Sequence, residues 1–112
     1  MKLELIGKPE GCKLLRVTME VAPPSRTGDI HPPLNPSWLV THIQIRGDFF
    51  AIPEEAFDSL EQQLEGVPVA ELGRHFDGLA QKLGLECAGI TGTGLQSLAD
   101  ETIVRMTSTH GA

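Results

Sequence analysis

The sequence predicts an α+β domain, in which a small antiparallel sheet of three to four strands is followed by three helices packed on one of its faces. The first half alternates apolar and polar residues with a period of two, as a strand with one buried face requires. The second half repeats apolar residues at 3.6-residue spacing. Strands followed by helices are typical of an antiparallel sheet with helices on one side. With 112 residues and no internal repeat, residues 1–112 are expected to form a single domain.

Residues 1–21 are predicted to form a β-hairpin. Leu3 and Leu5 alternate with charged residues, which places both on one face of a strand. The segment 8–11, Lys-Pro-Glu-Gly, supplies a proline and a glycine for the turn. The second arm alternates in the same way, and its buried side chains are expected to be Leu15, Val17, Met19 and Val21.

Residues 22–37 do not continue this pattern. Five of the eight prolines fall in this segment. Because proline lacks the N–H that a β-ladder needs, the segment cannot be a central strand. We expect a proline-rich loop insertion, which is either a mobile hairpin tip or a loop that docks on a partner.

A third strand is predicted from Trp38 onward. Gly47 and Asp48 interrupt its alternation, which suggests a bulge or a bend. Residues 49–52 then continue in extended form up to Pro53. In the strand itself one face is expected to hold Leu39, Thr41, Ile43 and Ile45, and the other Val40, His42, Gln44 and Arg46.

Three helices are predicted in the second half. Pro53 suits a first helical position, and the two glutamates after it complement the positive end of the helix dipole. Gly66 follows as a C-terminal glycine, and a second helix is expected from about Pro68 to Gly84. Their apolar stripes are Ala56, Phe57, Leu60 and Leu64 in the first helix, and Leu72, Phe76, Leu79, Ala80 and Leu83 in the second.

The third helix begins after Thr91, which is a good N-cap residue. Ile90 before the cap can pack on Leu95 as a hydrophobic staple. After Arg105 the chain is expected to fray.

Charge and hydropathy exclude several classes of function. Nine Lys and Arg stand against fifteen Asp and Glu, and no basic cluster is present, so nucleic-acid binding is not expected. The longest apolar runs are three or four residues, too short to span a bilayer. Glu4 interrupts the apolar stretch that a signal peptide would need, so a cytoplasmic location is expected.

Candidate catalytic and metal-binding groups are few. The four histidines, which lack partners at metal-ligand spacing, are His31, His42, His75 and His110, so no metal site is expected. The glycines of residues 89–94 are not followed by the lysine of a phosphate-binding loop. No catalytic residue is therefore assigned, and a stand-alone enzyme is the weakest of the hypotheses.

The two cysteines are too few for a disulfide scaffold. Cys12 lies in the predicted turn and is expected to be exposed, where Glu10 disfavours its thiolate while Lys8 and Lys13 favour it. It is the candidate reactive thiol. Cys87 is expected to be a small buried hydrophobe.

The segment Arg46, Gly47, Asp48, Phe49 and Phe50 is the candidate partner interface. Two adjacent aromatic residues on a regular strand must face opposite sides, so one ring can join the core while the other is exposed. An exposed phenylalanine flanked by charges is typical of an interface anchor. The alternative is a bulge that buries both rings.

These segments together resemble the C-terminal accessory domain of lipoate–protein ligases. The residues that carry the resemblance are Gly-Cys-Lys-Leu-Leu-Arg-Val at 11–17, Ile-Gln-Ile-Arg-Gly-Asp-Phe-Phe at 43–50, Pro-Glu-Glu at 53–55, Leu-Glu-Gly at 64–66 and Gly-Ile-Thr at 89–91. The resemblance covers nearly the whole chain except residues 22–37.

The resemblance implies a role, a partner and a fold. In this family the small domain is either fused behind a large catalytic domain or made as a separate subunit, and the length of this chain resembles the separate form. The large subunit would hold lipoate and ATP, so this chain would bind no cofactor itself. It would assist formation of lipoyl-adenylate during protein lipoylation without supplying catalytic groups, and would meet the lipoyl-acceptor domain at most indirectly. The implied fold is similar to that of iron–sulfur scaffold and sulfur-acceptor proteins.

Two departures from the family leave open a specialised relative with a different partner, and a rival hypothesis from another class of protein stands beside it. The insertion at 22–37 is longer than the family's short turn, and Cys12 replaces a common glycine. The rival is a sulfur-acceptor or iron–sulfur assembly protein that uses Cys12, since such a role needs a reactive thiol. A three-cysteine scaffold is excluded because the chain has two cysteines.

Overall fold

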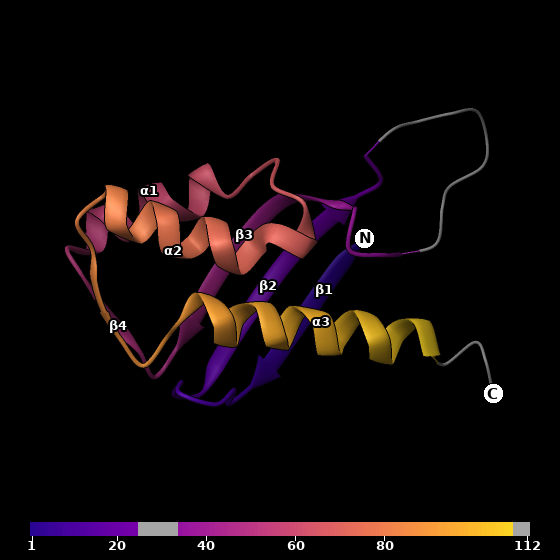
Figure 1. Cartoon of the computed structure of the whole chain (residues 1–112), viewed down its shortest axis with the longest axis horizontal. Helices are drawn as coiled ribbons and strands as arrows, with labels where there is room; N and C mark the ends of the chain where they lie inside the picture. The colour runs from indigo at the N-terminus through magenta and orange to yellow at the C-terminus, as the bar shows by residue number, and fades with distance from the viewer. Residues whose placement is uncertain (25–33, 109–112) are drawn as a thin grey trace.

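Three helices cover one face of a three-stranded antiparallel sheet (Figure 1). The computed structural model describes residues 1–24 and 34–108. This arrangement confirms the predicted α+β class. The elements are β1 (Lys2–Gly7), β2 (Leu15–Ala22), β3 (Leu39–Gly47), β4 (Phe50–Ile52), α1 (Glu54–Gln63), the 3-10 turn η1 (Val69–Glu71), α2 (Leu72–Lys82), β5 (Glu86–Ala88) and α3 (Gly92–Ser108).

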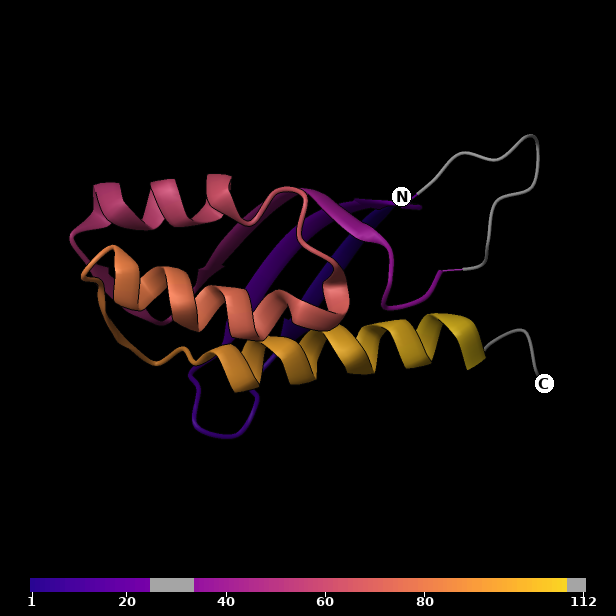
Figure 2. The ribbon, with the colours of Figure 1, turned by 45° about the horizontal axis from the view of Figure 1, so that its top comes forward.

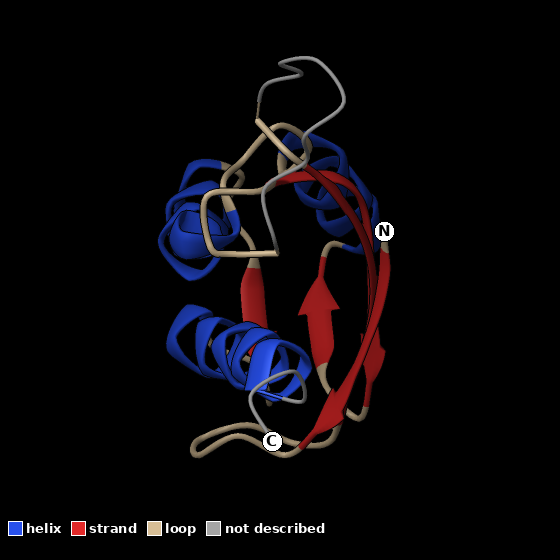
Figure 3. Cartoon of the chain, turned by 90° about the vertical axis from the view of Figure 1, so that its right-hand side faces the viewer, coloured by secondary structure: helices blue, strands red, loops and turns tan. Residues whose placement is uncertain are grey.

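The main sheet has the strand order β1-β2-β3, with Leu5 opposite Val17 and Val17 opposite Ile45. The predicted alternation is confirmed for β1 and β2, because every second side chain is buried against the helices. Figure 3 shows the helices on one side of the main sheet only. The buried side chains of this sheet include Leu3, Leu5, Leu15, Val17, Met19, Val21, Ile43 and Ile45.

The predicted alternation is wrong at the start of β3. Val40 is buried and Thr41 is exposed, the reverse of the expected order. His42 lies opposite Glu20 whereas Val40 lies opposite Val21, so Thr41 is an extra residue on β3. Such a β-bulge adds one residue to the strand, so the side chains before it face the opposite way from those that an unbroken alternation predicts.

The chain leaves the main sheet at Gly47, where φ is +146°. A Cβ atom there would lie 2.1 Å from the Leu14 carbonyl oxygen, so only glycine fits. The predicted interruption at residues 47–48 is confirmed. However, β4 does not extend the main sheet: it pairs with β5, a strand that was not predicted, in a separate two-stranded sheet (the β4–β5 ribbon). The ribbon lies at the end of the molecule away from the amino terminus (Figure 1).

The helices lie side by side in front of the strands (Figure 2). The Thr91 hydroxyl accepts a hydrogen bond from the Gly94 N–H at 3.0 Å, which confirms the predicted N-cap of α3. The expected fraying after Arg105 is wrong for the next three residues, since α3 continues to Ser108. Helix α3 packs along β1, and the buried Ile103 and Thr102 hold its later turns against the core.

Helices α2 and α3 touch through backbone atoms. A Cβ atom on Gly73 would lie 2.2 Å from the Gly92 carbonyl oxygen, and one on Gly92 would lie 2.3 Å from that of Gly73. A glycine inside a helix normally weakens it, but here the missing side chains let the two helices meet. This contact fixes how α3 lies against α2.

The outer edge of β3 is covered by the segment after α1. The Val40 N–H donates to the Val67 carbonyl oxygen at 2.9 Å, and the Gly66 N–H donates to that of Val40 at 2.6 Å. Leu34 and Trp38, which lead into β3, are buried in the core. The central part of the predicted insertion, residues 25–33 with His31, lies outside the described residues, as do residues 109–112 with His110. None of the described helices is long and apolar enough to cross a membrane.

Candidate functional site

The predicted interface segment lies where β3 ends and the β4–β5 ribbon begins. The Arg46 side chain is exposed, yet its guanidinium Nη1 lies 3.3 Å from the Glu61 carboxylate. It also donates to the carbonyl oxygen of Ile45 at 3.0 Å. Asp48 is exposed, and its N–H donates to the Leu14 carbonyl oxygen at 2.9 Å. Part of the charge of Arg46 is therefore compensated within the chain.

The two phenylalanines separate as predicted. Phe49 is half-buried, and its ring centroid lies 5.3 Å from that of Phe57 in the core. Phe57 in turn meets Phe76 edge-on at 6.3 Å. The Phe50 side chain is 58% exposed. The alternative, in which both rings are buried, is excluded.

The exposed ring of Phe50 belongs to a larger surface, which we call the ribbon face: Phe50, Ile52, Glu86 and Ala88. On β4 the side chains of Phe50 and Ile52 point outward while Ala51 between them is buried. Ala88 lies opposite Phe50, and Glu86 lies opposite Ile52. Sequence reasoning missed Glu86 and Ala88, because β5 has only three residues and carries no periodic signal. It placed Ile52 in an extended segment but did not assign it to the interface.

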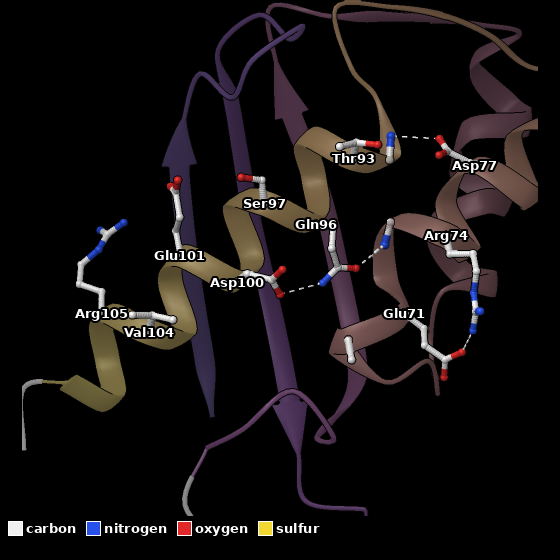
Figure 4. A pocket seen from close by; sticks show the side chains of 13 residues that line it. Glu71, Arg74, Asp77, Thr93, Gln96, Ser97, Asp100, Glu101, Val104 and Arg105 are labelled. Carbon is white, nitrogen blue, oxygen red and sulfur yellow. Dashed lines mark hydrogen bonds and ion pairs between the residues drawn. The ribbon is translucent and has the colours of Figure 1, made fainter.

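A second candidate is an open groove of about 1130 Å³ between the start of α2 and the length of α3 (Figure 4). Several of its polar side chains bond to one another or to the backbone. The Gln96 amide accepts from the Gly73 N–H at 2.8 Å and donates to the Asp100 carboxylate at 2.9 Å. The Asp77 carboxylate accepts from the Gly92 N–H at 3.0 Å. These bonds hold α2 and α3 together, so the groove is explained by helix packing.

The expected exposure of Cys12 is wrong, since its side chain is 7% exposed. Its Sγ lies 3.5 Å from the Thr91 hydroxyl. The turn after β1 folds back onto the start of α3, and the Lys13 N–H donates to the Gly89 carbonyl oxygen at 2.8 Å. This long-range contact buries a thiol that local sequence places on the surface.

Cys87 lies on β5, where it is half-buried against the core, somewhat less buried than expected. Burial raises the pKa of the Cys87 thiol above its ordinary value, and the charge of Asp77 raises it further. A raised pKa lowers the thiolate fraction at neutral pH, which makes this thiol a poor nucleophile.

The described histidines lie apart on the surface. His42 is on the open face of the main sheet, as expected, and its Nδ1 lies 4.0 Å from the Glu65 carboxylate. His75 is exposed on α2. Within residues 1–24 and 34–108 no group of three or more His, Cys, Asp and Glu side chains could hold a metal ion.

No family model and no curated protein matches this sequence. A solved structure does match: a chain from the structure of an archaeal lipoylation system, a bi-partite lipoate protein ligase and its E2 lipoyl domain from Thermoplasma acidophilum. It is 21% identical, with a TM-score of 0.60 over 88% of this chain and 94% of that chain. At this identity the likeness shows a common fold, and the two chains are of similar size. The expected similarity to iron–sulfur scaffold and sulfur-acceptor proteins stays a prediction.

Proposed function

We propose that this chain is a non-catalytic accessory subunit of a lipoate–protein ligase. It assists a separate large subunit in forming lipoyl-adenylate during protein lipoylation. The observation that carries the proposal is the fold that it shares, over nearly the whole of both chains, with a chain from a bi-partite lipoate protein ligase system. The sequence resemblance at residues 11–17 and 43–50 supports the same family.

In this proposal lipoate and ATP bind to the large subunit, and this chain acts through contact. Phe50 is exposed, and the ring of its neighbour Phe49 packs on Phe57. An exposed ring on a fixed backbone is the kind of aromatic anchor that such contact requires. The segment Arg46–Phe50 therefore lies at the surface presented to the large subunit.

The test is reconstitution with the large lipoate-ligase subunit of the same organism. Lipoyl-adenylate formation is measured as lipoate-dependent pyrophosphate release, with and without this chain. We expect the chain to bind the large subunit and to raise the rate severalfold or more. Absence of both binding and stimulation would overturn the proposal.

The burial of Cys12 disfavours a sulfur-acceptor role for this chain. A sulfur acceptor needs a thiolate that reaches its donor, whereas the Cys12 Sγ is enclosed by Thr91 and the start of α3. A Cβ atom on Gly94 would lie 2.3 Å from that sulfur, which shows how closely the helix covers it.

A further inference from the structure

We infer that the ribbon face is the docking surface for the large subunit, and that the surface it meets is an apolar pocket ringed by Lys and Arg side chains. This inference rests on the proposed function. It extends the candidate interface from one segment of chain to both strands of the β4–β5 ribbon.

The ribbon face concentrates exposed apolar side chains. Phe50 and Ile52 are 58% and 56% exposed, and they point to the same side of a three-residue strand. Ala88, across from Phe50, is exposed as well. Single exposed apolar residues are ordinary, but adjacent ones on one face mark interaction surfaces. Elsewhere in the described chain, Met1 precedes β1 and Ile6 lies near its end, and Val104 and Met106 lie two residues apart on α3, where side chains diverge.

The ribbon face is held in place from beneath. Ala51, behind Phe50 and Ile52, is buried, and Phe49 packs on Phe57. At the other end, the Gly89 carbonyl oxygen bonds to the backbone of the turn after β1. Because the backbone is already fixed, docking would cost little ordering of the chain, which favours affinity.

Carboxylates lie close along the chain to the apolar side chains of the ribbon face, and Glu86 lies opposite Ile52. Asp48 precedes β4, Glu54 and Glu55 follow it, and Glu86 lies within β5; all four are exposed. Arg46, which precedes β4, is bonded to Glu61. Among the described residues, the other cations near the ribbon are Lys13, whose side chain lies beside Gly89, and Lys82, which precedes β5, so the four carboxylates outnumber them. A complementary partner surface therefore carries cations around an apolar pocket.

The same charges argue against a second copy of this chain as the occupant. A two-fold contact through the ribbon face would place Glu86 and its neighbouring carboxylates close to their own copies. Like charges facing each other across an interface disfavour that pairing. The occupant is thus a different protein, and the proposed function identifies it as the large subunit.

The inference is tested by affinity measurements between this chain and the large subunit. The apolar variant is the double substitution Phe50→Ser and Ile52→Ser. Its matched control is Ile6→Ser with Val104→Ser, since both control side chains are 63% exposed and lie off the ribbon face. We expect the apolar variant to bind on the order of 100-fold more weakly. The control should bind within about twofold of the unmodified chain, as expected for residues outside an interface.

A second pair of variants tests the charged rim without removing an apolar contact. Glu86→Lys should slow association by about tenfold and remove much of its dependence on salt, whereas Glu4→Lys on the open face of the sheet should change neither strongly. Circular dichroism confirms that each variant is folded before binding is measured.

The outcomes separate the two claims. If the unmodified chain does not bind the large subunit, both the proposed function and this inference fail. If it binds and stimulates, but the Phe50/Ile52 and Glu86 variants bind equally well, only the inference fails. If the unmodified chain forms a dimer that the Phe50/Ile52 variant abolishes while ligase binding persists, a second copy is the occupant and the inference is overturned.

Discussion

The Glu61 carboxylate accepts a hydrogen bond from the backbone N–H of Ile45 at 2.6 Å. Ile45 lies on β3, an edge strand of the main sheet, and this N–H points away from β2. The donor would be buried without a partner if α1 did not supply one. Glu61, only 9% exposed, therefore completes the hydrogen bonding of the strand edge, and its second contact holds Arg46.

Replacing Glu61 is expected to destabilise the fold. Glu61→Ala leaves the buried Ile45 N–H unsatisfied and should lower the free energy of unfolding by about 1–3 kcal/mol. Glu61→Gln keeps an acceptor oxygen and should cost less. Urea unfolding of both variants checks this, and equal stability of Glu61→Ala and the unmodified chain would contradict it.

The two ring truncations should affect different quantities, the stability of the fold for Phe49→Ala and the affinity for the large subunit for Phe50→Ala. Phe49→Ala removes a ring packed on Phe57 and should lower the free energy of unfolding by roughly 3 kcal/mol. Phe50→Ala should leave it within about 0.5 kcal/mol, because the side chain is exposed, while weakening binding to the large subunit by about 1–3 kcal/mol. Thermal unfolding and titration calorimetry measure the two quantities. Equal loss of stability in both variants, with stimulation of the ligase retained, would make the segment part of the core only.

Gly73 and Gly78, both on α2, allow a matched test of the contact between α2 and α3. Gly73→Ala places a methyl group against the Gly92 carbonyl oxygen and should destabilise the chain by about 1–3 kcal/mol or more. Nothing lies within 4 Å of a Cβ on Gly78, so Gly78→Ala should stabilise it by about 0.5–1 kcal/mol. Denaturant midpoints compare the two. If Gly73→Ala stabilised the chain, the close contact between α2 and α3 would not contribute to the free energy of unfolding.

Both thiols should react slowly in the folded chain. The raised pKa of Cys87 lowers its thiolate fraction at neutral pH, so its alkylation by iodoacetamide should be slow there and accelerate as the pH is raised. Cys12 should be slow because it is buried. Single Cys→Ser variants separate the two rates, and the urea-unfolded chain is the control. Rapid alkylation or persulfide capture at Cys12 in the folded chain would restore the sulfur-acceptor hypothesis.

The isolated chain should not bind ATP. The amino-terminal end of α3 follows a glycine-rich segment, but its Gly92 N–H is bonded to the Asp77 carboxylate and its Gly94 N–H to the Thr91 hydroxyl. A carboxylate at that position repels phosphate, which otherwise favours helix amino termini. Isothermal titration should detect no heat of binding, and a micromolar dissociation constant would contradict the expectation.

Much of the fold could be predicted because its signals are local. Alternation in the first two strands, the interruption at Gly47 and the Thr91 cap each depend on neighbouring residues. The features that were missed depend on contacts between distant segments. The three residues of β5 become a strand only by pairing with β4, and Cys12 is buried by α3.

The candidate site shows the same difference between features set by neighbouring residues and features set by distant contacts. The separation of Phe49 and Phe50 follows from strand geometry and was predictable. Glu86 and Ala88 join Phe50 through the pairing of β5 with β4, which no local pattern indicates. The role of Glu61 was not predictable either, because a glutamate in a helix normally faces solvent.

The backbone bonds of Val40 to Gly66 and Val67 also affect the tendency of the isolated chain to aggregate. An uncovered strand edge is a template for aggregation, since its free N–H and C=O groups can accept a strand from another molecule. Here the outer edge of β3 is already bonded at Val40 and again at Ile45. Because the outer edge of β3 is closed in this way, the ribbon face can stay exposed without a strand from another molecule adding to β3.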